Sequence, residues 1–170
     1  MRVAIALLAV LLAGCASTPT PSPSESPDPQ TKRTQQFDTT FESRKSIFHV
    51  VGEESEKSYG WSKYAGRTDF LDNRFRAEML VANDYVKGNG TFEGFVTLMS
   101  PEGDIGLRIT GVSTEGAQGP GSAYSGETEV IGGTGEYDTL AGRGRFTGER
   151  TGATGTPISV EVSLELINPK

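Results

Sequence analysis

The sequence predicts an all-β domain, and three of its features support this prediction. Of the 22 glycines, 18 lie from Gly88 onward, and an interior glycine weakens a helix by about 1 kcal/mol. Residues 156–167 alternate Ile, Val and Leu with mostly polar residues, a period of two that gives a strand one buried face and one wet face. Residues 132–146 (GGTGEYDTLAGRGRF) form a glycine-rich crossover between two further alternating stretches. Short strands and tight turns therefore suit this half of the chain better than helices.

The chain begins with a segment that is typical of protein export, residues 1–14. Arg2 supplies a positive charge and residues 3–12 form an apolar run, which is too short for a bilayer that takes about 20 residues to cross. The following Leu-Ala-Gly-Cys15 resembles the lipobox of bacterial lipoproteins. This resemblance implies cleavage before Cys15 and a diacylglycerol on its sulfur. We therefore expect a lipoprotein signal peptide and a membrane anchor, with a plain secretory signal as the open alternative.

Residues 15–36 are expected to form a lipidated tether. Five of the nine prolines lie between Pro19 and Pro29, interleaved with Ser, Thr and acidic residues. Such a stretch cannot bury enough apolar surface to fold, and its prolines favour an extended conformation. The tether should hold the domain several nanometres from the bilayer.

The folded domain is expected at residues 37–170, and its strands follow from short apolar runs. The first run is SIFHVV at 46–51, whereas residues 59–70 mix aromatic and charged residues and receive no assignment. Residues 75–86 fit both a strand and a helical spacing, and we choose a strand because the downstream pattern is strand-like. Further strands are predicted at 91–99, 105–112, 125–131, 142–148 and 156–167, with a turn at 100–104 and a long loop at 113–122.

Gly132, Gly133 and Gly135 are predicted to shape the crossover, because glycine allows positive φ and close backbone approach. Residues 136–140 are just long enough for one helical turn. The segment should carry the chain across the end of a barrel and close it. A phosphate-binding loop is a poor alternative, because the GxGxxG order, a P-loop lysine and a long following helix are all absent from the sequence here.

The crossover also resembles a known family. GGTG, an aromatic residue two positions later (Tyr137) and Ala141-Gly142 before a strand are similar to the pattern of the allene oxide cyclase-like barrel superfamily. Upstream, GNGTFEG at 88–94 and Gly103-Asp104 also fit bacterial members, so that the likeness covers roughly residues 81–167. It implies an antiparallel eight-stranded barrel, related to dirigent proteins. A barrel of about eight strands is either filled by side chains or holds one small ligand.

Few residues of the sequence suggest chemistry. The chain has one His and one Cys, so zinc and iron–sulfur sites are not expected, and no cofactor is predicted. His49 lies in an apolar run and is a poor candidate for a catalytic base. Glu93 and Arg108 are weak catalytic candidates, because each lies in a predicted strand. Glu93 points into a cavity if Phe95 shares its inner face, and it meets water if Phe92, Val96 and Leu98 face inward instead.

Two functions remain open at this stage. The first is a non-catalytic lipoprotein, anchored on the extracytoplasmic face of the cell envelope, whose barrel binds a small apolar ligand or an envelope partner. The alternative is an allene oxide cyclase-like cyclase or isomerase acting on a small hydrophobic substrate, which a cavity of about 300 Å³ or more with inward polar groups favours. The net charge of −6 argues against a nucleic-acid partner, whose binding needs a basic face.

Charge and parity predict how the C-terminal strands pair. Glu127 and Glu129 share a face of one strand, Arg143 and Arg145 share a face of the next, and Glu161 and Glu165 lie opposite the apolar stripe of the last. Opposite charges on neighbouring strands stabilise a sheet by about 0.2–1 kcal/mol per pair. We therefore expect the arginine strand to lie between the other two, with both guanidinium groups outside.

Overall fold

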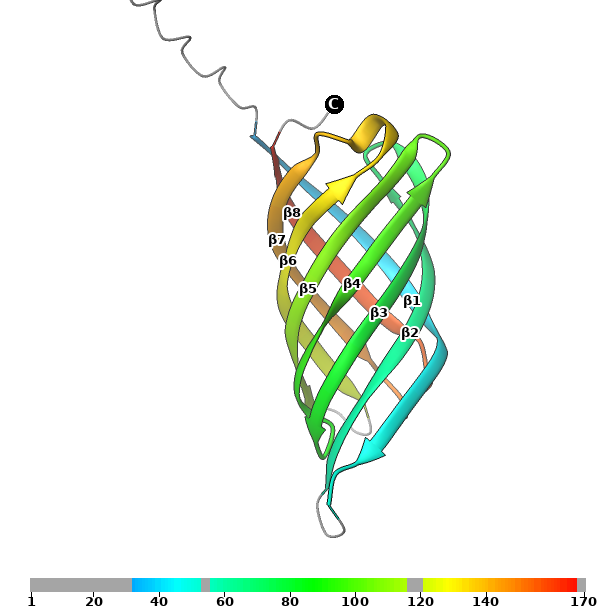
Figure 1. Cartoon of the computed structure of the whole chain (residues 1–170), viewed down its shortest axis with the longest axis vertical. Helices are drawn as coiled ribbons and strands as arrows, with labels where there is room; N and C mark the ends of the chain where they lie inside the picture. Colours follow the sequence, from blue (N-terminus) through cyan, green and yellow to red (C-terminus); the bar gives the residue numbers. More distant parts are fainter. Residues whose placement is uncertain (1–31, 53–55, 116–120, 168–170) are drawn as a thin grey trace, which may run out of the picture.

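The chain forms a closed antiparallel barrel of eight strands, in which each strand pairs with the next and β1 pairs with β8 (Figure 1). The computed structural model describes residues 32–52, 56–115 and 121–167. The elements are β1 Lys32–Val50, β2 Lys57–Phe70, β3 Asn73–Val86, β4 Asn89–Ser100, β5 Gly103–Glu115, β6 Ser122–Gly133, the 3-10 helix η1 Gly135–Tyr137, β7 Ala141–Arg150 and β8 Ile158–Ile167. The predicted all-β, eight-stranded antiparallel barrel is thus confirmed.

The barrel begins earlier in the chain than the sequence predicts. Residues 32–36, which were expected in the tether, form the start of β1 and pair with β8, for example Lys32 with Ile167. Their side chains are mostly exposed, so that backbone pairing and not an apolar face makes them a strand. The predictions for residues 1–31, including the signal peptide, Cys15 and the rest of the tether, lie outside the described residues.

The middle strands resolve the ambiguities of the sequence. Residues 75–86 lie within β3, as predicted, and the unassigned residues 59–70 lie within β2. β5 extends to Glu115 and β6 starts at Ser122, where these two residues are partners. The predicted loop at 113–122 is therefore too long at both ends, because strand pairing continues into it; its residues 116–120 lie outside the described part of the chain.

One end of the barrel is filled by packed side chains. Phe70 lies 6.4 Å from Phe75, whose ring lies 5.5 Å from that of Tyr137 (centroid distances). The hydroxyl of Tyr137 accepts a hydrogen bond of 2.8 Å from Nδ2 of Asn73. We call the buried side chains at this end, which belong to one apolar cluster, the plug: Phe70, Phe75, Leu98, Tyr137 and Leu166.

The glycine-rich crossover places Tyr137 in the plug, as expected for a segment that closes the barrel end. Its helical turn is Gly135–Tyr137, and so it is shorter and earlier than the predicted 136–140. Gly135 has φ 60°, and a Cβ there would lie 2.1 Å from the backbone oxygen of Glu102. The amide of Glu136 donates to that same oxygen at 3.0 Å. Close approach to the β4–β5 turn therefore requires glycine at this position.

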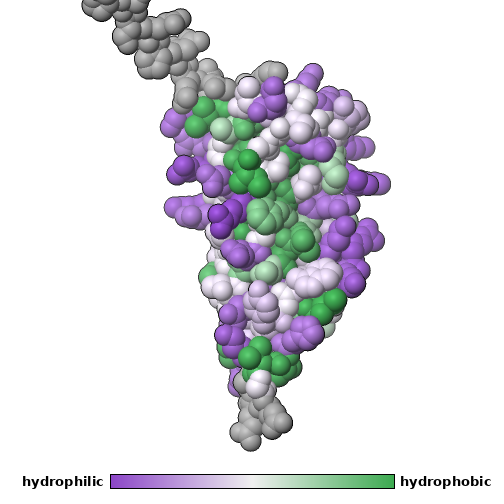
Figure 2. All heavy atoms as spheres, in the orientation of Figure 1, coloured by the Kyte–Doolittle hydropathy of each residue, from purple (hydrophilic) through white to green (hydrophobic). Residues whose placement is uncertain are grey.

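On the side of the barrel shown in Figure 2, a band of apolar side chains runs between polar ones. Leu80 and Phe95, both about half exposed, are cross-strand partners within this band. Among the described residues, no helix has both the length and the apolar character needed to span a bilayer.

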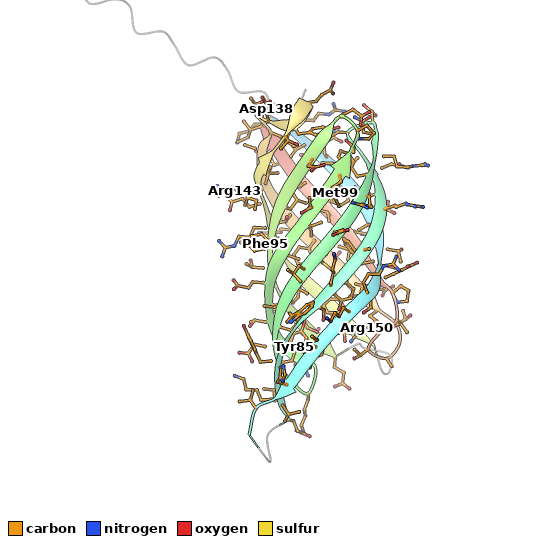
Figure 3. The ribbon with its side chains drawn as sticks, turned by 45° about the vertical axis from the view of Figure 1, so that its right-hand side comes forward. Tyr85, Phe95, Met99, Asp138, Arg143 and Arg150 are labelled. Atoms are coloured by element: carbon orange, nitrogen blue, oxygen red, sulfur yellow. The ribbon has the colours of Figure 1, made fainter. Side chains whose placement is uncertain are left out.

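The predicted order of the charged strands is confirmed. β7 lies between β6 and β8, and Arg143 is the register partner of Glu129 on one side and of Glu165 on the other. Arg143 and Arg145 are exposed, and Figure 3 shows Arg143 projecting away from the barrel. Acidic, basic and acidic residues thus follow one another across these three strands on the outer face, because the residues that alternate with them along each strand face inward.

Candidate ligand-binding cavity

The other half of the barrel is not filled, and it encloses a cavity of about 260 Å³. The cavity starts beside Phe37 and Leu107 and reaches the opposite barrel end at Gly88 and Thr154. These two residues lie in the β3–β4 turn and the β7–β8 connection, and we call this the loop end. Most of the lining is apolar, including Phe41, Val81, Val96, Ile109, Phe146 and Val162.

Inward-facing glycines make room for the aromatic rings of this lining. A Cβ at Gly126 would lie 2.7 Å from Cζ of Phe146, and a Cβ at Gly111 would lie 2.8 Å from Cζ of Phe92. The Phe92 ring lies 6.0 Å from the rings of both Tyr124 and Phe146. The glycines therefore let three rings gather inside the barrel, where they form one apolar wall of the cavity.

A polar group lines the same cavity towards the loop end. It consists of three tyrosines and one arginine from four different strands: Tyr64, Tyr85, Tyr124 and Arg150. Figure 3 shows Tyr85 and Arg150 in the lower half of the barrel. Nη2 of Arg150 donates to Oγ of Ser122 at 3.0 Å, and the guanidinium carbon lies 6.0 Å from the centre of the Tyr124 ring. Nε of Arg150 is buried and has no hydrogen-bond partner.

Burial keeps two tyrosines of this group, Tyr64 and Tyr85, neutral near physiological pH. Burial raises the pKa of the Tyr85 hydroxyl far above its ordinary value, and it also raises the pKa of Tyr64. The Tyr85 hydroxyl donates to Oδ1 of the buried Asn83 at 3.0 Å. Arg150 is therefore the only group charged at neutral pH among the described residues that line the cavity.

The two catalytic candidates lie outside the barrel. Glu93 and Arg108 are exposed, and their closest charged atoms, Oε2 and Nη2, lie 3.8 Å apart. Phe92 and Val96 line the cavity instead, so the arrangement in which Glu93 meets water is the correct one. His49 is exposed on β1. The crossover glycines Gly132, Gly133 and Gly135 lie at the plug end, away from the cavity.

Sequence reasoning missed all four residues of the polar group. Arg150 has the parity of Phe146, which faces inward, but the predicted strand stopped at residue 148. Tyr64 lies in the stretch that received no assignment, and Tyr124 immediately precedes a predicted strand. Among the described residues no group of three His, Cys, Asp or Glu side chains is placed to hold a metal ion. With its apolar wall and single cation, the cavity is suited to binding an amphipathic small molecule.

The comparisons with known proteins do not identify the chain. No protein-family model and no curated protein matches it. Among solved structures, it is similar to a protein of unknown function of the DUF3224 family from Shewanella oneidensis MR-1. The TM-score is 0.47 and the identity 20%, with 83% of this chain and 99% of that chain covered. A likeness of this strength assigns neither a family nor a function.

Proposed function

We propose that this protein is a lipoprotein on the extracytoplasmic face of the cell envelope, whose barrel binds a small, mainly apolar ligand without transforming it. The observation that carries the binding function is the cavity of about 260 Å³ with its apolar lining. Its volume lies just below the range of about 300–1,000 Å³ that is usual for small-molecule sites, which suits a ligand of modest size. The anchor is proposed on the Leu-Ala-Gly-Cys15 sequence alone.

Blocking the cavity tests the binding function. Val160 lines the cavity, whereas Val112 is 44% exposed on the outer face. Val160→Phe should therefore fill part of the cavity and weaken the binding of the neutral fluorescent probe N-phenyl-1-naphthylamine by about tenfold or more, as expected for lost burial of apolar surface. The measurement is a fluorescence titration of the full chain carrying Cys15→Ser.

Val112→Phe is the matched control, because it adds the same ring outside the barrel and should leave the affinity unchanged. Both variants keep the same N-terminal residues, so that any binding of the probe there cancels in the comparison. Equal affinities for the two variants and the unsubstituted chain would contradict a ligand site inside the barrel.

The second candidate function is an allene oxide cyclase-like cyclase or isomerase acting in the same cavity. The observation that favours it is the polar group of Tyr64, Tyr85, Tyr124 and Arg150 against an apolar wall. A cavity without an Asp, Glu or His among its described lining residues lacks the carboxylates and imidazole that serve most often as general bases, and for this reason we rank binding first. Mass spectrometry and NMR of a ligand before and after incubation separate the two, since an isomerase returns a changed molecule.

A further inference from the structure

The unpaired guanidinium of Arg150 points to the charge of the ligand. No ion pair among the described residues involves Arg150. Its Nε is buried without a hydrogen-bond partner, although Nη2 is bound to Ser122. Arg150 as a whole is only partly buried, but a charge with reduced access to water and no counter-charge is less favourable than a paired one, and an anion placed beside it lowers this cost. The cavity thus has a positively charged side chain without a negatively charged partner among the described residues.

We propose that the cavity binds a monoanionic amphiphile, namely a small carboxylate with an apolar body, and that its head group pairs with the guanidinium of Arg150. This inference rests on the proposed ligand-binding function and adds the chemical class of the ligand. Arginine suits a carboxylate because it offers two parallel N–H donors to the two oxygens. Arg150 lines the cavity, and a small shift of its side chain brings the unpartnered Nε, which is closed to solvent as it lies, to the head group.

The position of Arg150 sets the direction in which such a ligand lies. Arg150 is the last residue of β7 and Ser122 is the first of β6, so both lie at the loop end. The lining farther in, towards the plug, is apolar and includes Phe37, Leu107 and Val162. The head group therefore sits near the loop end and the apolar body extends towards the plug.

The remaining polar groups favour an anion over a cation. The cavity lining offers tyrosine hydroxyls and no carboxylate among the described residues, so no carboxylate there repels the ligand. At about 30 Å³ per water molecule, the cavity matches the volume of roughly nine waters. A carboxylic acid of about ten non-hydrogen atoms, such as octanoate, is of matching size.

The head group is tested with two molecules of the same chain length, octanoate and 1-octanol. Each displaces N-phenyl-1-naphthylamine from the full chain carrying Cys15→Ser near neutral pH, where octanoate is ionised. An ionised head group costs more to desolvate than a hydroxyl, so octanoate binds more tightly only if a cation meets it. We expect octanoate to bind about tenfold or more tighter than 1-octanol, as a charge-assisted hydrogen bond provides.

Arg150→Gln should abolish or reverse this preference while leaving the affinity for 1-octanol nearly unchanged. Arg143→Gln is the matched control, because it removes the same charge from the same strand on the outer face and should keep the preference. Arg150→Lys keeps the charge but loses the two-donor geometry, and it should retain only part of the preference. Thermal melts of each variant report whether the barrel is intact.

The outcomes separate this inference from the function on which it rests. If 1-octanol binds as tightly as octanoate to the unsubstituted chain, or if Arg150→Gln keeps the preference, the carboxylate assignment is wrong while ligand binding stands. The ligand-binding function itself fails if neither molecule displaces the probe, or if displacement is the same from Val160→Phe as from the unsubstituted chain. Should Arg150→Gln not fold, the comparison of head groups on the unsubstituted chain decides alone.

Discussion

At the scale of single residues, Gly135 shows how strongly the plug depends on one missing side chain. Its φ of 60° costs an L-residue about 1–2 kcal/mol, and a Cβ would also lie 2.1 Å from the Glu102 oxygen. We expect Gly135→Ala to lower the free energy of unfolding by at least about 2 kcal/mol, measured by urea denaturation. Gly106→Ala is the control, since its Cβ would meet ordinary contacts of 3.4 Å and beyond; equal losses would show that the crossover tolerates a side chain.

At the scale of secondary-structure elements, the start of β1 makes a sharp prediction. Deleting residues 32–36 moves Pro27 and Pro29 into the register that pairs with β8, where proline lacks the N–H of the ladder. It also removes the ion pair of 2.9 Å between Lys32 and Glu165. We expect the thermal midpoint to fall by several degrees, because each lost hydrogen bond costs about 0.5–1.5 kcal/mol.

A deletion of residues 18–30 is the matched comparison, because it keeps the β1–β8 register and removes only tether residues. Its thermal midpoint should equal that of the unaltered chain within error. A fall of several degrees would mean that these residues pack on the barrel, contrary to the expectation of a solvated tether.

The strands differ in how well the sequence predicts them. The alternation in β8 and the parity of Arg143 and Arg145 are local patterns, and they give the correct buried faces. The same approach does not find the buried face of β1. A register irregularity between Ser43 and Lys45 separates the buried part of this strand from the apolar run SIFHVV. In that run Phe48 is 39% and Val50 72% exposed. Such an irregularity depends on the pairing with the partner strand, and the sequence of β1 alone does not predict it.

The cavity illustrates the same limit. Its volume depends on rings of Phe92 and Phe146 that pack over glycines of β5 and β6, which are contacts between residues distant in the sequence. Arg150 faces inward by parity, but only its pairing with Ser122 extends the strand far enough to include it. A periodic pattern predicts which face of a strand is buried, whereas it does not predict where packing leaves a space.

At the scale of the whole molecule, the start of β1 and the cavity lie towards opposite ends of the barrel. β1 starts beside the C-terminal end of β8, at the plug end, so that Lys32, where the described part of the chain begins, lies away from the loop end. We expect Cys15→Ser to move the protein from the membrane pellet to the soluble fraction, because the acyl chains of a lipoprotein supply the stable anchoring. The measurement is cell fractionation with immunoblotting; a variant that remains in the pellet would place the anchor elsewhere.

The filled plug has a kinetic consequence for any molecule held in the cavity. Since the plug side is packed with buried side chains such as Phe75 and Leu98, both 0% exposed, arrival and departure share the loop end. An occupant must leave before its successor arrives, so exchange is first order in the complex and its rate does not rise with the concentration of a competitor. For the proposed ligand, the barrel is therefore a site with one route of entry and exit, at the loop end.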